Sequence, residues 1–157
     1  MDTSFTAEEH FRRGCAALES GEHATALEHF RVAQKVDPTS PRYRSYYGLC
    51  VGISKRRFDQ ALELCRSAAK EEFFNPALYR NLAQVHLAFG FKAEAIRFLR
   101  RGLMIDPANQ PILEDLRSLG VRRRPSLNFL PRRHLFNRWL GMVRGRSRAD
   151  AGERCSA

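Results

Sequence analysis

Residues 75–107 read NPALYRNLAQVHLAFGFKAEAIRFLRRGLMIDP, and this stretch decides the fold class. Apolar residues recur at helical spacing on both sides of Gly90, which predicts two helices joined by a turn. Asn75-Pro76 is typical of a helix N-cap followed by a first-turn proline. Asp106-Pro107 ends the second helix, because proline disfavours helical geometry in the residue before it. The stretch therefore predicts a helical hairpin.

The same arrangement of small residues and a closing proline precedes this stretch twice. Asp37-Pro38 closes one unit, and we take Asn75-Pro76 to close the next. The small residues that recur before each closing proline are Gly14, Ala26 and Ala33, then Gly48, Ala61 and Ala68, then Ala83, Ala95 and Gly102. A repeat of about 34 residues with this pattern is typical of stacked helical hairpins. We expect Gly14, Gly48 and Ala83 to lie where paired helices cross, because a longer side chain there would force the helices apart.

Residues 7–108 resemble three tetratricopeptide repeats on these small residues and prolines. The resemblance implies an all-α solenoid of three helical hairpins, with repeats at about 7–40, 41–75 and 76–109. The first unit departs from the family pattern at two positions, where His10 replaces the preferred Trp and Arg13 replaces the preferred Leu. We expect that edge of the first hairpin to be less tightly packed.

Residues 110–120 are predicted to form a helix that caps the array, so that the repeat domain covers residues 5–120. Ile112, Leu113, Leu116 and Leu119 make one apolar stripe, and Gly120 ends the helix. Such a helix covers the apolar flank that the last hairpin would otherwise expose.

Residues 121–157 form an arginine-rich tail that carries most of the formal net charge of +10. Residues 132–144 are predicted to be a short amphipathic helix, and the residues after it are predicted to be disordered. The candidate contact residues of this helix are Arg132, Arg133, Phe136, Arg138 and Trp139. Its apolar stripe could pack on the repeats, occupy their groove as an autoinhibitor, bind a partner, or lie on an anionic membrane. A tail of this charge also binds nucleic acid weakly and without sequence preference.

Motifs for catalysis or cofactor binding are absent from the sequence. It contains no phosphate-binding glycine loop, no H-E-x-x-H motif and no C-x-x-C pair. We therefore expect neither an enzyme, nor a cofactor, nor a metal site. His86 is expected to be a packed, hydrogen-bonded side chain. With no secretory signal and no apolar run long enough to span a bilayer, we expect a cytoplasmic protein.

The resemblance implies that the first helix of each repeat lines a concave groove. The candidate groove residues are Phe11, Cys15, Leu18, Arg42, Ser45, Leu49, Arg80, Gln84 and Leu87. We expect this groove to bind an extended peptide of a partner protein, with Arg42 and Arg80 pairing with its carboxylates. Phe11, Leu49 and Leu87 are the candidate apolar contacts. The alternatives are that these are ordinary surface residues, and that the tail associates with an anionic membrane or nucleic acid.

The residue types argue against membership of one subfamily. Co-chaperone members hold the acidic ends of heat-shock chaperones with a clamp of Lys, Asn and Arg on the first helices. The matching positions here are Phe11, Cys15, Tyr46, Ala77 and Asn81, which supply no cation. The function predicted from the sequence is therefore a non-catalytic adaptor, with self-association through the ends of the array as a further possibility.

Overall fold

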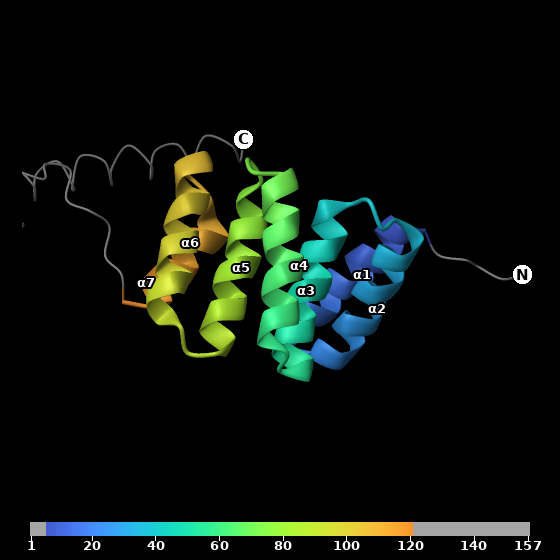
Figure 1. The fold of residues 1–157 in the computed structure, drawn as a ribbon. Helices are drawn as coiled ribbons and strands as arrows, with labels where there is room; N and C mark the ends of the chain where they lie inside the picture. The colour runs from blue at the N-terminus through green and yellow to red at the C-terminus, as the bar shows by residue number, and fades with distance from the viewer. Residues whose placement is uncertain (1–5, 121–157) are drawn as a thin grey trace, which may run out of the picture. The chain divides into compact units, whose positions relative to one another are not determined.

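The computed structural model describes residues 6–120, and within that range all regular structure is α-helical. The helices are α1 (Ala7–Glu19), α2 (His23–Val36), α3 (Pro41–Lys55), α4 (Phe58–Glu71), α5 (Pro76–Ala88), α6 (Lys92–Ile105) and α7 (Gln110–Ser118). Figure 1 shows three antiparallel hairpins in chain order, α1–α2, α3–α4 and α5–α6, with α7 against α6. The all-α solenoid expected from the sequence is confirmed.

The first helix of every hairpin, and α7, begins at a polar N-cap. Side-chain oxygens of Thr6, Ser40, Asn75 and Asn109 accept hydrogen bonds from backbone N–H groups in the first helical turn. These bonds satisfy donors that the helix itself leaves unpaired. The second helices have no side-chain cap and follow directly from tight turns.

The register of the second unit differs from the sequence prediction. Asp37, Glu72 and Asp106 each donate a backbone hydrogen bond of 3.0 Å to the carbonyl four residues earlier, and each ends its helix. Glu72-Phe73 is therefore the counterpart of Asp37-Pro38. Asn75-Pro76 begins α5 and does not close α4, so our assignment of it as a closing pair is wrong.

The second unit therefore ends without the proline that ends its neighbours. Phe73 stands in that place, and Tyr79 donates a hydrogen bond of 2.9 Å from its hydroxyl to the Phe73 carbonyl. The backbone at Glu72 (φ −111°, ψ 69°) remains close to that at Asp37 (φ −130°, ψ 88°). The turn geometry is thus maintained without proline at this position.

Gly14 and Gly48 lie at close helix crossings, as expected. A Cβ added at Gly14 would come within 2.7 Å of the Phe30 ring, and one at Gly48 within 2.8 Å of Leu64 Cβ. Ala83 is fully buried. Residues with side chains at the two glycine positions would push the paired helices apart.

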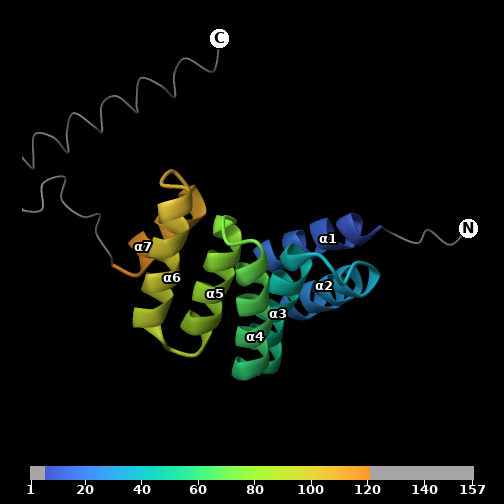
Figure 2. The same ribbon diagram turned by 45° about the horizontal axis from the view of Figure 1, so that its top comes forward.

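An aromatic cluster lies between α1 and α3. The Phe11 ring lies 5.2 Å from that of Tyr43 and 5.0 Å from that of Tyr46, and Phe30 of α2 contacts Phe11 and Tyr46 as well. The α3–α4 and α5–α6 hairpins meet through aliphatic side chains such as Leu49 and Val85. Phe58 of α4 adds ring contacts to His86, Phe89 and Phe91. Figure 2 shows the α1–α2 hairpin turned relative to the α3–α4 hairpin.

The capping helix α7 buries Ile112, Leu113 and Leu116. A Cβ at Gly102 of α6 would come within 2.6 Å of Ile112 Cδ1, so the glycine lets α7 approach closely. Gly120 follows with a positive φ of 74°, a conformation that glycine adopts without strain. The tail, with its predicted helix at 132–144 and its five candidate contact residues, lies outside the described residues.

Candidate functional site

Three of the nine candidate groove residues belong to the packed core. Ser45 and Leu49 have no exposed surface, and Phe11 is 8% exposed. Helix α3 lies between α2 on one side and α5 on the other, so its central positions are covered from both directions. The prediction that Ser45 and Leu49 line a groove is wrong for this conformation, and Phe11 offers almost no apolar surface.

Ser45 instead takes part in a buried polar contact between repeats. Asn81 of α5 donates from its side-chain amide to the Ser45 hydroxyl at 3.1 Å, and the Cys65 thiol donates to the Ser45 carbonyl at 3.3 Å. Asn81 is only 3% exposed. A pair of buried polar groups must be mutually satisfied, so this contact helps to fix the register of α3 against α5.

The other six candidates are partly exposed and come from the first helices of the three repeats. They are Cys15, Leu18, Arg42, Arg80, Gln84 and Leu87. Both candidate arginines remain in this set, and both are paired with carboxylates of the chain itself.

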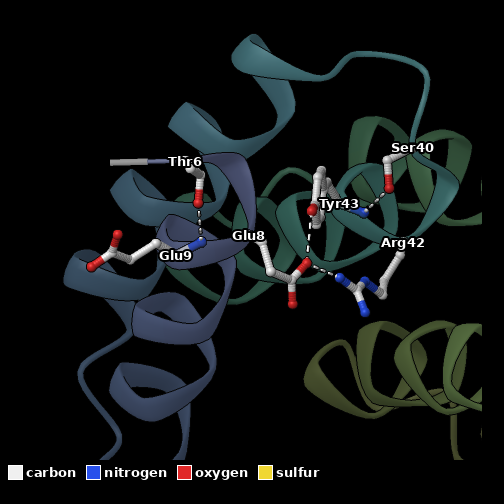
Figure 3. A network of polar contacts seen from close by, with 6 residues as sticks. All are labelled: Thr6, Glu8, Glu9, Ser40, Arg42 and Tyr43. Carbon is white, nitrogen blue, oxygen red and sulfur yellow. Dashed lines mark hydrogen bonds and ion pairs between the residues drawn. The ribbon is translucent and has the colours of Figure 1, made fainter. Parts of the chain in front are cut away.

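Arg42 lies in a small network that joins α1 to α3 (Figure 3). Its guanidinium donates to the Glu8 carboxylate, and the Tyr43 hydroxyl donates to the same oxygen at 2.8 Å. The guanidinium also lies over the Phe11 ring, with Cζ 4.3 Å from the ring centroid. Glu8 thus receives two donors, and Arg42 rests on an aromatic face while its pair with Glu8 stays open to solvent.

The pKa directions of this network follow from those contacts. Partial burial acts to lower the pKa of Arg42, but the contacts to Tyr43 and Glu8 outweigh it, and the pKa is raised. The pKa of Tyr43 is raised by burial and by its hydrogen bond to Glu8. At neutral pH the site therefore holds a fixed guanidinium cation beside a carboxylate and a neutral phenol.

Arg80 binds Asp115 of α7 with two hydrogen bonds. Its Nε donates to Asp115 Oδ2 at 2.7 Å, and one terminal nitrogen donates to Oδ1 at 3.3 Å. The two side chains are 35% and 21% exposed, so the pair is more buried than Arg42–Glu8, whose side chains are 41% and 52% exposed. This two-point geometry ties the capping helix to the third repeat.

The sequence analysis missed these two acidic partners, although a signal for them was present. Glu8 precedes Arg42 by 34 residues, and Asp115 follows Arg80 by 35 residues, which is one repeat in each case. Residues one repeat apart occupy neighbouring places on adjacent first helices. Opposite charges at that separation therefore predict a contact between repeats.

Thiol chemistry is disfavoured at all three described cysteines. Burial raises the pKa of Cys15 to about 11, and it raises the pKa of Cys50 and of Cys65 to about 12. Thiols in this state are protonated near neutral pH and are poor nucleophiles.

His86 is buried, but the predicted hydrogen bond is wrong for residues 6–120. The ring is 4% exposed, and neither nitrogen has a hydrogen-bond partner there. It stacks on Phe98 and meets Phe58 and Phe91 edge-on. Its pKa is lowered, first by burial and then by the charge of Arg66.

None of the helices in residues 6–120 has the length and apolar character needed to cross a membrane. The same residues contain no group of three or more His, Cys, Asp or Glu side chains arranged to hold a metal ion.

Residues 53–119 match the family model described as tetratricopeptide repeat. The matched residues include the whole third hairpin and the capping helix. Over these residues the chain is similar to tetratricopeptide repeat proteins. A search of curated proteins found no match.

Solved tetratricopeptide repeat structures have the same fold at low identity. The first repeat domain of human RPAP3 is 18% identical with a TM-score of 0.58, covering 73% of this chain and 90% of that one. The Arabidopsis OM64 repeat domain is 19% identical with a TM-score of 0.56, covering 72% and 93%. PcrH, solved with the chaperone-binding region of PopB, is 20% identical with a TM-score of 0.54, covering 72% and 93%. At these identities the likeness shows the fold of the tetratricopeptide repeats.

Proposed function

We propose that this protein is a non-catalytic interaction module that binds an acidic, extended segment of a partner protein along its first helices. Its structural neighbours support the general role. The first repeat domain of RPAP3 was solved with an HSP90 peptide, and PcrH with a region of PopB. The observation that carries the acidic preference is that Arg42 and Arg80, on two of the three first helices, each hold a carboxylate.

Arg42 is the proposed point of exchange. A salt bridge as exposed as Arg42–Glu8 contributes about 0.2–1 kcal/mol, so a partner carboxylate can replace Glu8 at little cost. The guanidinium stays oriented during the exchange because it rests on the Phe11 ring. An arginine held in this way loses little side-chain freedom on binding.

Arg80 is proposed as a secondary contact. Its two hydrogen bonds to Asp115 hold α7, and a partner that replaced Asp115 would also loosen the capping helix. We therefore expect a bound segment to approach Arg80 without displacing Asp115. Gln84, one helical turn further along α5, offers neutral donors and acceptors beside it.

Leu18 and Leu87 are the proposed apolar contacts. Both are partly exposed, whereas Leu49, which we had expected to share this role, is fully buried. Leu18 also borders both core clusters of the stack, so its position is well supported. Anchors on well-packed elements bind with less loss of conformational freedom than anchors on mobile ones.

The chaperone-tail clamp is not part of the proposal. Among the positions where its polar residues would stand, Phe11 is almost fully buried and Asn81 is committed to Ser45. The carboxylate-binding residues that we propose, Arg42 and Arg80, therefore stand at different positions from that clamp.

A peptide selection tests the proposal. Short random peptides with free C-termini are selected on the tag-free full-length chain at about 150 mM salt, where long-range attraction to the basic tail is screened. We expect the wild type to enrich acidic peptides, and Arg42→Glu to lose that enrichment. The matched control is Arg31→Glu on α2, which makes the same change of charge at an exposed arginine of a second helix.

The outcome against the proposal is also defined. If Arg42→Glu selects the same acidic peptides with unchanged affinity, Arg42 does not contact them. If Arg31→Glu and Arg42→Glu lose binding equally, the effect is one of net charge alone. Either result removes Arg42 from the contact surface.

A further inference from the structure

Two histidines meet across the first hairpin. His10 of α1 and His29 of α2 have their Nδ1 atoms 3.1 Å apart, with ring centroids separated by 5.4 Å and planes inclined by 44°. Both side chains are partly buried. The histidines are 19 residues apart, so no short-range motif reveals the pair.

We propose that His10 and His29 form a binding site for a divalent transition-metal ion, held through both Nδ1 atoms. Metal–nitrogen bonds of about 2.0–2.1 Å at angles between 90° and 109° place two ligand nitrogens about 2.9–3.4 Å apart. The observed separation of 3.1 Å lies inside that range without any movement of the helices. Imidazole nitrogen is a preferred ligand of zinc, nickel and copper ions.

Binding of a metal ion to the two neutral histidines releases no proton overall. With no metal, one Nδ1–H donates to the other Nδ1, which accepts. With a metal, each neutral ring carries its proton on Nε2 and offers the Nδ1 lone pair, so one ring changes tautomer.

The rest of the coordination sphere is assigned to water. Residues 6–120 hold no cluster of three potential ligands, so this part of the chain provides two nitrogens to the site. Two nitrogens give a weaker site than a structural zinc centre, which has four protein ligands. The general order of affinities predicts tighter binding of Cu²⁺ than of Zn²⁺ or Ni²⁺.

The consequence of metal binding lies in the first hairpin. His10 occupies the place where the resemblance to tetratricopeptide repeats implies a large Trp side chain, so apolar packing between α1 and α2 is reduced there. A metal held by both helices links them directly. Because the folded chain presents the two nitrogens together and the unfolded chain does not, binding stabilises the fold.

Calorimetric titration of the tag-free full-length protein with Zn²⁺ and with Cu²⁺ tests the proposal. We expect one ion per chain for the wild type. His10→Gln and His29→Gln should each weaken binding by at least about tenfold, since each removes one of the two ligands. The matched control is His23→Gln, which replaces an exposed histidine on the same helix as His29 and should leave affinity unchanged. Equal binding by all four proteins would overturn the site.

Electron paramagnetic resonance of the Cu²⁺-loaded wild type gives a second measurement that does not depend on any variant folding. Hyperfine structure from two equivalent imidazole nitrogens is expected, and one nitrogen or none would overturn the site. The result is independent of the peptide selection, because neither histidine belongs to the proposed contact surface.

Discussion

Gly48 shows how one residue sets the distance between two helices. In an exposed helix, replacing glycine by alanine stabilises the protein by about 1 kcal/mol through helix propensity. At Gly48 the new Cβ would lie 2.8 Å from Leu64 Cβ and 3.1 Å from the Ala61 carbonyl oxygen. The backbone atom cannot rotate away, so crowding decides the sign of the effect.

We therefore predict that Gly48→Ala lowers the free energy of unfolding by about 1–3 kcal/mol. Chemical denaturation followed by circular dichroism measures the change. Gly52→Ala on the same helix is the control, because its nearest neighbour is the Ala61 side chain at 3.1 Å, and it should cost less. Equal stability of Gly48→Ala and wild type would contradict the close crossing.

His86 is expected to make stability depend on pH. Burial lowers its pKa in the folded state, so the ring stays neutral there while the unfolded chain takes up a proton near pH 6.5. Stability from the neutral ring is thus present above about pH 6.5 and is lost as the pH falls toward the folded pKa. His86→Phe places an apolar ring among Phe58, Phe91 and Phe98 and removes this titration.

We predict that His86→Phe raises the free energy of unfolding at pH 7 by about 1–3 kcal/mol, since it removes a buried polar ring that has no hydrogen-bond partner among residues 6–120. Its advantage over the wild type should grow between pH 7 and pH 5. Denaturation midpoints at several pH values measure both effects. A constant difference across that range would show that His86 does not titrate differently in the folded state.

At the scale of the element, the end of α4 differs from the ends of α2 and α6. Phe73 stands where Pro38 and Pro107 follow those helices, its side chain is 61% exposed, and no hydrogen bond from its backbone N–H is found among residues 6–120. Proline is therefore compatible with this position. It would restrict the unfolded chain more than the folded one.

We predict that Phe73→Pro raises the free energy of unfolding by about 0.4–1 kcal/mol. Thermal denaturation measures this change. The control is Phe74→Ala, which removes the adjacent exposed ring without restricting the backbone, so it separates the effect of losing a ring from the effect of proline. Destabilisation by Phe73→Pro would show that the turn after α4 differs from the other two.

The attachment of α7 depends on one ion pair as well as on its apolar face. Asp115→Asn removes the charge that Arg80 holds, and we expect a loss of about 0.5–1 kcal/mol because the pair is only partly buried. Amide hydrogen exchange in α7 should become about twofold to fivefold faster. Glu114→Gln, an exposed neighbour on the same helix, should leave these rates unchanged. Unchanged exchange in Asp115→Asn would mean that apolar packing alone holds α7.

At the scale of residues 6–120, hairpins contact mainly their neighbours in the chain. Such an array loses structure locally when one interface is weakened. Phe30 is fully buried between Phe11, Gly14 and Tyr46, at the interface that joins the first hairpin to the second.

We predict that Phe30→Ala costs about 3–5 kcal/mol and that its effect on hydrogen exchange is greatest in α1 and α2, with α5 and α6 retaining protection. Leu99 of α6 is also fully buried. Leu99→Ala should therefore reduce hydrogen-exchange protection most in α5 and α6, with α1 and α2 retaining protection. If both variants lose protection evenly along residues 6–120, the three hairpins unfold as one cooperative unit.

The sequence by itself determined the helices, their order and their crossings. N-cap residues such as Ser40 and Asn75, and small residues such as Gly14 and Gly48, act on their own helix or on the partner within one hairpin. Local pattern therefore predicts them. Asn75-Pro76 was misassigned because one dipeptide serves both to close a helix and to open one, and only the register of the neighbouring turns distinguishes the two.

Only the tertiary structure decided which first-helix residues face solvent and which charges meet. Ser45 and Leu49 share their repeat positions with Arg80 and Gln84, yet they are fully buried because α3 is covered on both sides. The pairs Glu8–Arg42 and Arg80–Asp115, and the meeting of His10 with His29, join separate helices. Exposure and pairing depend on the packing of distant segments, which no single helix encodes.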